Sequence, residues 1–147
     1  MPITINGSGT VTGITAGGLP DGVITTDDIA ANAVTYAKIG TTEQGQLCKA
    51  WVNFNGTGVV AIRASYNVSS ITDNGTGDYT VNFTSALVDA NYAFTVGWRG
   101  TANDDTDFSP VLYTGASPST TAARFVTNNQ STGLRVDIDY VCISFFR

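Results

Sequence analysis

Apolar and polar residues alternate along most of the chain after residue 49, which is the period of a strand with one buried face. Asn55-Gly56 and Asn74-Gly75 are turn signals between such runs, because Asn and Gly tolerate positive φ. Between residues 78 and 84 the odd-numbered residues are predicted to face the core and the even-numbered ones, Asp78 included, to face solvent. Six to eight strands in about 100 residues predict an all-β fold, an antiparallel β-sandwich or jelly roll. The predicted strands are 50–55, 60–65, 78–84, 92–98 and 134–140, with weaker ones at 111–113 and 122–127.

The C-terminal run 141–146 carries apolar side chains at alternating and intervening positions alike. A strand that is apolar on both faces must be covered on both. Two arrangements satisfy this requirement: a central strand under the domain's own loops, or a strand at a subunit interface, which would suit a trimer with Arg147 at the exposed rim. The predicted interface residues are Val141, Ile143, Phe145 and Phe146.

Residues 1–46 differ in composition from the rest of the chain. They contain one aromatic residue and several Gly-rich turn sequences. Burial of their few large apolar side chains would not offset the conformational entropy lost on ordering the segment. We therefore expect 1–46 to be an extended N-terminal arm that orders against another chain, and 47–147 to be the β-sandwich domain. The predicted docking residues of the arm are Ile24, Ile29, Val34, Tyr36 and Ile39.

A weak internal repeat lies within this arm. Residues 23–30 align with residues 33–40 at a ten-residue offset, with the shared frame apolar-Thr-x-x-charged-Ile. The stretch 19–39 resembles the AVTxxKI repeats of tail-fibre and other fibrous virion proteins of tailed bacteriophages. Residues 50–58 and 68–83 are similar to a β-domain found at the C-termini of such proteins.

This resemblance implies a non-enzymatic structural protein of a tailed-phage virion, made in the cytoplasm of the bacterial host. It implies a tail-fibre or short adhesion module whose arm docks on the tail and whose β-domain faces the host. Together with the C-terminal pattern, the arm predicts a homotrimer. The expected partners are other copies of the chain, other virion proteins of the tail or capsid, and a host surface glycan or protein.

Two other functions remain open. In a capsid decoration (cement) protein the arm would spread over capsid subunits and the β-domain would clamp neighbours, which suits a small chain with one domain. A polysaccharide-degrading tail enzyme is disfavoured by the scarcity of Glu and the absence of His, because hydrolysis of glycans needs two placed carboxylates.

Composition and charge exclude several classes. Charged residues make up 13% of the 147 residues, against about 25% in soluble domains, and a single Glu and two Lys make a helical bundle very improbable. With a net charge of −5 and scattered arginines, the chain lacks the basic patch that nucleic acid binding requires. The N-terminus has neither a positive region nor an apolar one, and no run approaches a bilayer span, so we expect neither a secretory signal nor membrane insertion.

Candidate chemistry is sparse. The absence of His removes Ser–His–Asp chemistry and imidazole metal ligands. Asp137 and Asp139 fall on one face of the predicted strand 134–140 and are the nearest approach to a carboxylate pair, although we expect them to form a solvated surface. Asp104-Asp105-Thr106-Asp107 lacks the Gly and the terminal Glu of an EF-hand, so a solvated loop is expected rather than a calcium site. No cofactor is predicted.

The cysteines and the tryptophans are assigned structural roles. We expect Cys142 to be a buried free thiol, with a Cys48–Cys142 disulfide as the alternative. Trp51 and Trp98 lie in predicted strands, and we expect each in the core or at an interface rather than at a ligand. If the protein recognises a receptor, the loops 97–108 and 114–121 are the expected contacts, through Arg99, Asn103, Asp104, Asp105, Ser117 and Ser119.

Overall fold

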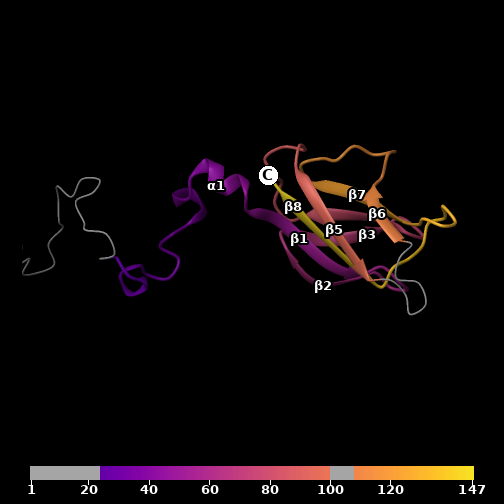
Figure 1. The fold of residues 1–147 in the computed structure, drawn as a ribbon, viewed down its shortest axis with the longest axis horizontal. Coiled ribbons are helices and arrows are strands. Elements are labelled where there is room, and N and C mark those ends of the chain that lie inside the picture. Colours follow the sequence, from indigo (N-terminus) through magenta and orange to yellow (C-terminus); the bar gives the residue numbers. More distant parts are fainter. Residues whose placement is uncertain (1–23, 100–107) are drawn as a thin grey trace, which may run out of the picture. The chain divides into compact units, whose positions relative to one another are not determined.

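A computed structural model of the chain describes residues 24–99 and 108–147. Its contacts divide the chain into two compact units, Met1–Ile39 and Gly40–Arg147. The second unit consists almost entirely of β-strands in its described parts, which confirms the predicted all-β class (Figure 1).

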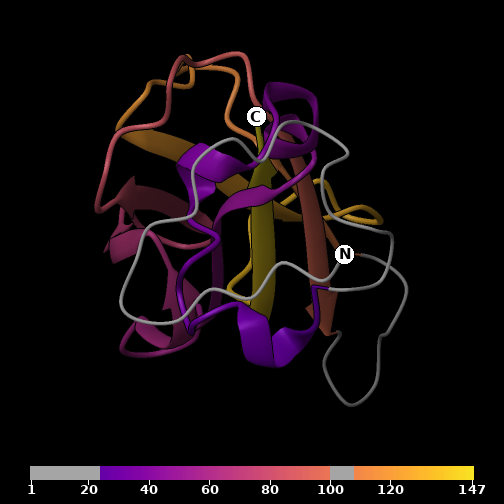
Figure 2. The same ribbon diagram turned by 90° about the vertical axis from the view of Figure 1, so that its left-hand side faces the viewer.

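Eight strands of the second unit form two antiparallel four-stranded sheets, in the orders β2-β1-β8-β5 and β3-β4-β7-β6. The views in Figures 1 and 2 both place β8 next to β5 in the first sheet. The two sheets form the predicted sandwich-like domain, with the core between them. The elements are α1 (Thr41–Gly45), β1 (Cys48–Asn55), β2 (Ala61–Tyr66), β3 (Val68–Asp73), β4 (Asp78–Phe83), β5 (Ala93–Arg99), β6 (Phe108–Leu112), β7 (Ala122–Asn129) and β8 (Tyr140–Phe146).

The core is built by the inward faces that alternation predicts. Every second residue of β1 is fully buried, and the same holds for the odd-numbered residues from 79 to 83 in β4. Aromatic rings meet edge to face at its centre, where Phe145 lies 4.9 Å from Phe83 and 5.9 Å from Phe125 between ring centroids. Such edge contacts stabilise a core beyond the area they bury.

The structure corrects the predicted strand 134–140. The last strand begins only at Tyr140, and residues 130–139 run outside both sheets except for an isolated bridge between Asn128 and Arg135. Their side chains nevertheless alternate, because Ile138 is fully buried whereas Leu134 is exposed. Alternation reports an extended backbone with one covered side, and this segment is extended without pairing to a neighbouring strand.

The two-sided C-terminal strand is the central strand that one of the two alternatives described. β8 lies between β1 and β5, and Val141, Ile143 and Phe145 are fully buried in the domain's own core. The prediction that these three residues form a subunit interface is therefore wrong. Phe146 lies on the opposite face of β8, where it is half-buried.

The first unit has little regular structure over residues 24–39. Its two elements are single 3₁₀ turns, η1 (Thr26–Asp28) and η2 (Tyr36–Lys38). The Asp28 carboxylate closes η1 by accepting hydrogen bonds from the backbone N–H and the hydroxyl of Thr25, at 2.9 and 2.8 Å. These bonds hold the pKa of Asp28 below its usual value.

Candidate functional site

The outer face of the sheet β2-β1-β8-β5 carries exposed aromatic side chains. Trp51 of β1 pairs with Tyr66 of β2 on one side and with Ser144 of β8 on the other, so the three share a face. Trp51 is 38% exposed and Tyr66 is 59% exposed. We call this surface the aromatic face and define it by Trp51, Asn53, Arg63, Tyr66, Tyr140 and Phe146.

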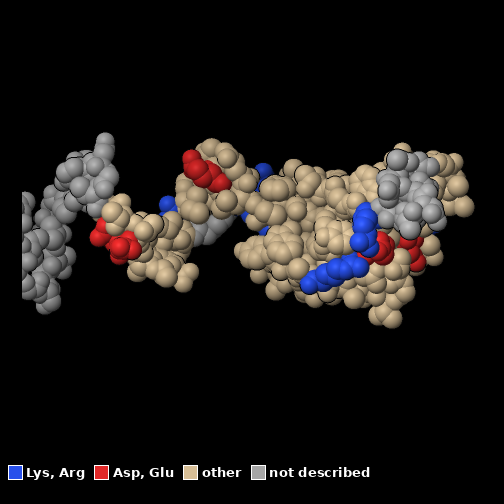
Figure 3. Space-filling model, turned by 60° about the horizontal axis from the view of Figure 1, so that its bottom comes forward, with Lys and Arg blue, Asp and Glu red and all other residues tan. Residues whose placement is uncertain are grey.

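The charged groups of the aromatic face gather around one ring. The guanidinium groups of Arg63 and Arg99 lie 5.2 and 5.6 Å from the centroid of Tyr140, within cation–π range. Arg99 also forms an ion pair with Asp139. Figure 3 shows a face of the protein on which uncharged residues cover most of the sandwich unit and charged side chains are confined to a small part of it.

The two tryptophans are not core residues, which corrects half of what the sequence predicts for them. Trp98 pairs with Val141 and therefore points to the core side of its sheet, but it remains 39% exposed near the end of β5. Trp51 points to the outer side. The alternative expectation, an interface, stays a prediction for both.

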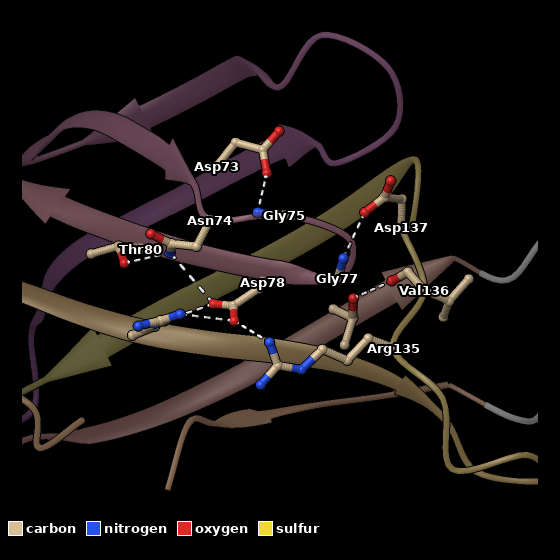
Figure 4. Close-up of polar contacts among 11 residues, drawn as sticks. Asp73, Asn74, Gly75, Gly77, Asp78, Thr80, Arg135, Val136 and Asp137 are labelled. Carbon is tan, nitrogen blue, oxygen red and sulfur yellow. Dashed lines mark hydrogen bonds and ion pairs between the residues drawn. The ribbon is translucent and has the colours of Figure 1, made fainter. Parts of the chain in front are cut away.

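A buried ion cluster surrounds Asp78 at the start of β4 (Figure 4). Asp78 is 1% exposed, although its place in the alternation predicts a solvated residue. Arg124 donates to it through Nε and Nη2 at 2.7 and 2.9 Å, and Arg135 forms a second ion pair. The hydrogen bonds from Arg124, with the nearby charge of Arg135, hold the pKa of Asp78 below its usual value despite its burial.

Tyr113 completes this cluster from above. Its ring lies 4.4 Å from the guanidinium of Arg124 and 5.0 Å from that of Arg135. Arg124 belongs to β7, whereas Arg135 belongs to the irregular segment 130–139. The cluster therefore ties that segment to the sheet, and its carboxylate, whose charge two arginines already compensate, is suited to structure rather than to proton transfer.

Asp137 likewise has a structural position. Its Oδ1 accepts hydrogen bonds from the backbone N–H of Gly77 at 2.6 Å (Figure 4) and from the hydroxyl of Tyr79 at 2.7 Å. The Tyr79 hydroxyl also lies 2.9 Å from the carbonyl of Gly56. Burial, followed by the contact with Asp137, raises the pKa of Tyr79.

The two carboxylates that the sequence places on one strand face thus have different partners. Asp137 binds Gly77 and Tyr79, whereas Asp139 binds Arg99. Neither lies in a regular strand. The Asp78 cluster has no evident signal in the sequence, because its two arginines are distant along the chain from the aspartate that they bind.

The predicted receptor-facing residues are only partly described. Asn103, Asp104 and Asp105 lie outside the described residues, as does the remainder of the acidic sequence 104–107. Ser117 is exposed, and Ser119 closes its own turn by accepting a hydrogen bond from the N–H of Ala122 at 3.0 Å. Arg99 is held by Asp139 and lies on the aromatic face side of β5.

The cysteines remain separate thiols. Cys48 and Cys142 are both free and partly buried. In the register of β1 and β8, Cys48 lies opposite Phe146 and Cys142 opposite Asn53, four residues away along the strand. That offset is about 13 Å, beyond the reach of a disulfide. Within residues 24–99 and 108–147, no three His, Cys, Asp or Glu side chains gather to hold a metal ion.

The predicted docking residues of the arm are solvent-exposed where the structure describes their side chains. Ile24, Ile29 and Val34 are 53%, 44% and 61% exposed. Ile39 is partly buried, and the side chain of Tyr36 lies outside the described part.

Comparison with known proteins adds no family assignment. No family model, curated protein or solved structure matches this chain. In the described parts of the chain, no helix is long and apolar enough to cross a membrane.

Proposed function

We propose that this chain is a non-enzymatic structural protein of a tailed-phage virion, a homotrimeric tail-fibre or adhesion module anchored by its N-terminal arm. The sequence resemblance of residues 19–39 to fibrous virion proteins supports the particle. The β-sandwich of residues 40–147 supplies a compact head domain whose core is complete within that unit.

The exposed apolar side chains of the arm carry this proposal. Ile24, Ile29 and Val34 follow one another through a segment with only two 3₁₀ turns, and each exposes more than two-fifths of its surface. Isolated exposed apolar residues are ordinary, but a regular series of them along a short segment is suited to docking on another chain. Docking would bury these side chains and contribute the free energy that orders the segment.

Locating the chain in purified particles tests the proposal. We expect antibody labelling at the tail, and we expect the double variant Ile29→Asn, Val34→Asn to be incorporated far less than the wild type. Ala31→Asn is the matched control, because it adds the same polar group to an exposed small residue of the same segment. Absence of the chain from particles, or equal incorporation of all three chains, would refute the proposal.

The capsid decoration alternative uses the same exposed segment, with capsid subunits as its docking surface. The same particles distinguish the two placements. A decoration protein is present in far more copies per particle than a tail fibre and labels the capsid rather than the tail.

A further inference from the structure

The two outer faces of the sandwich differ in chemistry. The outer face of β3-β4-β7-β6 is polar and satisfies its own hydrogen bonds: Asn82 Nδ2 donates to the hydroxyls of Ser70 and Thr72 at 3.1 and 2.9 Å, and Asn74 Nδ2 donates to that of Thr80 at 2.9 Å. A face whose side chains are bonded among themselves and to water is stable when exposed. This is the solvent face of the domain.

The aromatic face has the composition of the centre of a protein interface. Such centres are enriched in Trp, Tyr, Phe and Arg and depleted in Lys and Glu. Trp51, Tyr66, Tyr140 and Phe146 supply the rings, and β2, β5 and β8 contain no Lys or Glu. Trp51 and Tyr66 lie directly opposite each other on neighbouring strands, so their exposed rings form one continuous apolar area.

The charges of the aromatic face are incompletely paired. Among the described residues, Arg99, Arg124, Arg135 and Arg147 each pair with an aspartate, whereas Arg63 has no carboxylate partner. In the same described part, the two buried side-chain oxygens without a hydrogen-bond donor are Asp139 Oδ1 and Asn53 Oδ1. The aromatic face therefore carries both an arginine that lacks an acceptor and acceptors that lack a donor.

These unpaired groups originate from opposite sides of the sheet. Arg63 belongs to β2, one edge strand, whereas Asp139 is held by Arg99 of β5, the other edge strand. When identical faces surround a rotation axis, the β2 side of one copy meets the β5 side of the next. Such a contact joins different surfaces of the two copies and closes into a ring.

We propose that the aromatic face packs against a second copy of this chain, with Arg63 of one copy donating to Asp139 of the next and with Trp51 and Tyr66 at the apolar centre. This inference rests on the self-association in the proposed function and names the surface that performs it. Desolvation on packing strengthens the charge-assisted hydrogen bond and gives Asp139 Oδ1 the donor that it lacks.

The oligomeric mass of the full chain tests this inference. In sedimentation velocity at micromolar concentration we expect the wild type to have the mass of a closed ring, a trimer. Trp51→Ala removes a ring from the centre of the contact and should weaken association about thirtyfold or more. Arg63→Gln should weaken it about tenfold. Val111→Ala is the control, because Val111 is 40% exposed on the other sheet and its truncation should leave the mass unchanged.

Thiol labelling of Cys142 gives a second readout without altering the contact residues. Cys142 lies on the same side of β8 as Tyr140 and Phe146. In a Cys48→Ser background, its labelling rate should rise on dilution as the copies separate. A labelling rate independent of concentration would overturn the inference.

Three outcomes of the mass measurement would also overturn it. These are a monomeric wild type, an oligomer that neither Trp51→Ala nor Arg63→Gln weakens, and a monomer that binds host cells through Trp51, which would assign the face to a host ligand. A chain that is monomeric in solution and still incorporated into particles would overturn this inference alone and leave the proposed function standing.

Discussion

At the scale of single residues, Asp78 shows how strongly environment can depart from sequence pattern. It occupies a solvent-facing position of the alternation in β4 and is nevertheless buried under Arg124, Arg135 and Tyr113. A carboxylate is stable in such a place only because two guanidinium groups compensate its charge. Removing the carboxylate charge would leave those arginines held together without their counter-ion.

We expect Asp78→Asn to lower the free energy of unfolding of the sandwich by about 1–3 kcal/mol. A fully buried pair would cost more to break, but both arginines are about one-third exposed and can be solvated in part. Asp89→Asn is the matched control, since it breaks the exposed pair with Arg147 and should cost less than about 1 kcal/mol. Urea denaturation of both variants measures the difference, and equal costs would contradict the structural role of the cluster.

At the scale of elements, β8 and the turn before β4 define the sandwich. β8 separates a core face from the aromatic face within one strand, and adjacent residues along it therefore have unequal weight. The turn before β4 brings Gly77 close to the irregular segment 130–139, where its N–H binds Asp137. Each element makes a prediction that compares two neighbouring or equivalent positions.

Phe145 and Phe146 are expected to respond differently to truncation. Phe145→Ala removes the ring that contacts Phe83, Tyr92 and Phe125, and should destabilise the domain by about 3–5 kcal/mol. Phe146→Ala, on the half-buried outer side of the same strand, should cost the isolated domain much less. Denaturation under conditions that keep the chain monomeric compares them, and a larger loss at Phe146 would mean that the core face is assigned wrongly.

Gly77 and Gly133 distinguish backbone strain from crowding. Both have a left-handed backbone, with φ of 59° and 69°, so alanine costs about 1–2 kcal/mol at either position. A Cβ at Gly77 would also lie 2.7 Å from the carbonyl oxygen of Thr127 and from the N of Val136, whereas a Cβ at Gly133 meets open space. Thermal unfolding should therefore show a markedly larger loss for Gly77→Ala, and equal losses would exclude close packing around Gly77.

At the scale of the whole molecule, the chain has few charges and no histidine. Its described ion pairs all involve arginine and aspartate, whose charges are constant through the neutral range. Stability should therefore depend on pH only where aspartate titrates.

We expect the free energy of unfolding to be flat between about pH 5 and pH 8 and to fall below about pH 4. The pKa of Asp78 is lower in the folded state than its ordinary value of 3.8. As the pH decreases, the unfolded chain takes up the proton first, and the stabilisation present above pH 4 is lost as the pH falls through the folded pKa. Chemical denaturation at a series of pH values measures the slope, which should be shallower in Asp78→Asn; an unchanged slope would rule out Asp78 as its cause.

The amino-acid sequence by itself determined the all-β class, the sandwich and most of its core. Tyr79, Val81 and Phe83 are buried as their alternation predicts, because a strand with one wet face repeats with a period of two whatever its neighbours are. Composition also excluded a helical bundle, since a helix surface needs the Glu and Lys that this chain lacks.

The tertiary structure alone decided which elements meet. It showed that residues 134–139 alternate without joining a sheet, that the inward face of β8 belongs to the domain's own core, and that Asp78 finds arginines 46 and 57 positions away. It also assembled Trp51, Tyr66 and Tyr140 from three strands into one face. The physical reason is that local pattern fixes the direction of a side chain relative to its own backbone, whereas its partners depend on strand order, which a local pattern does not encode.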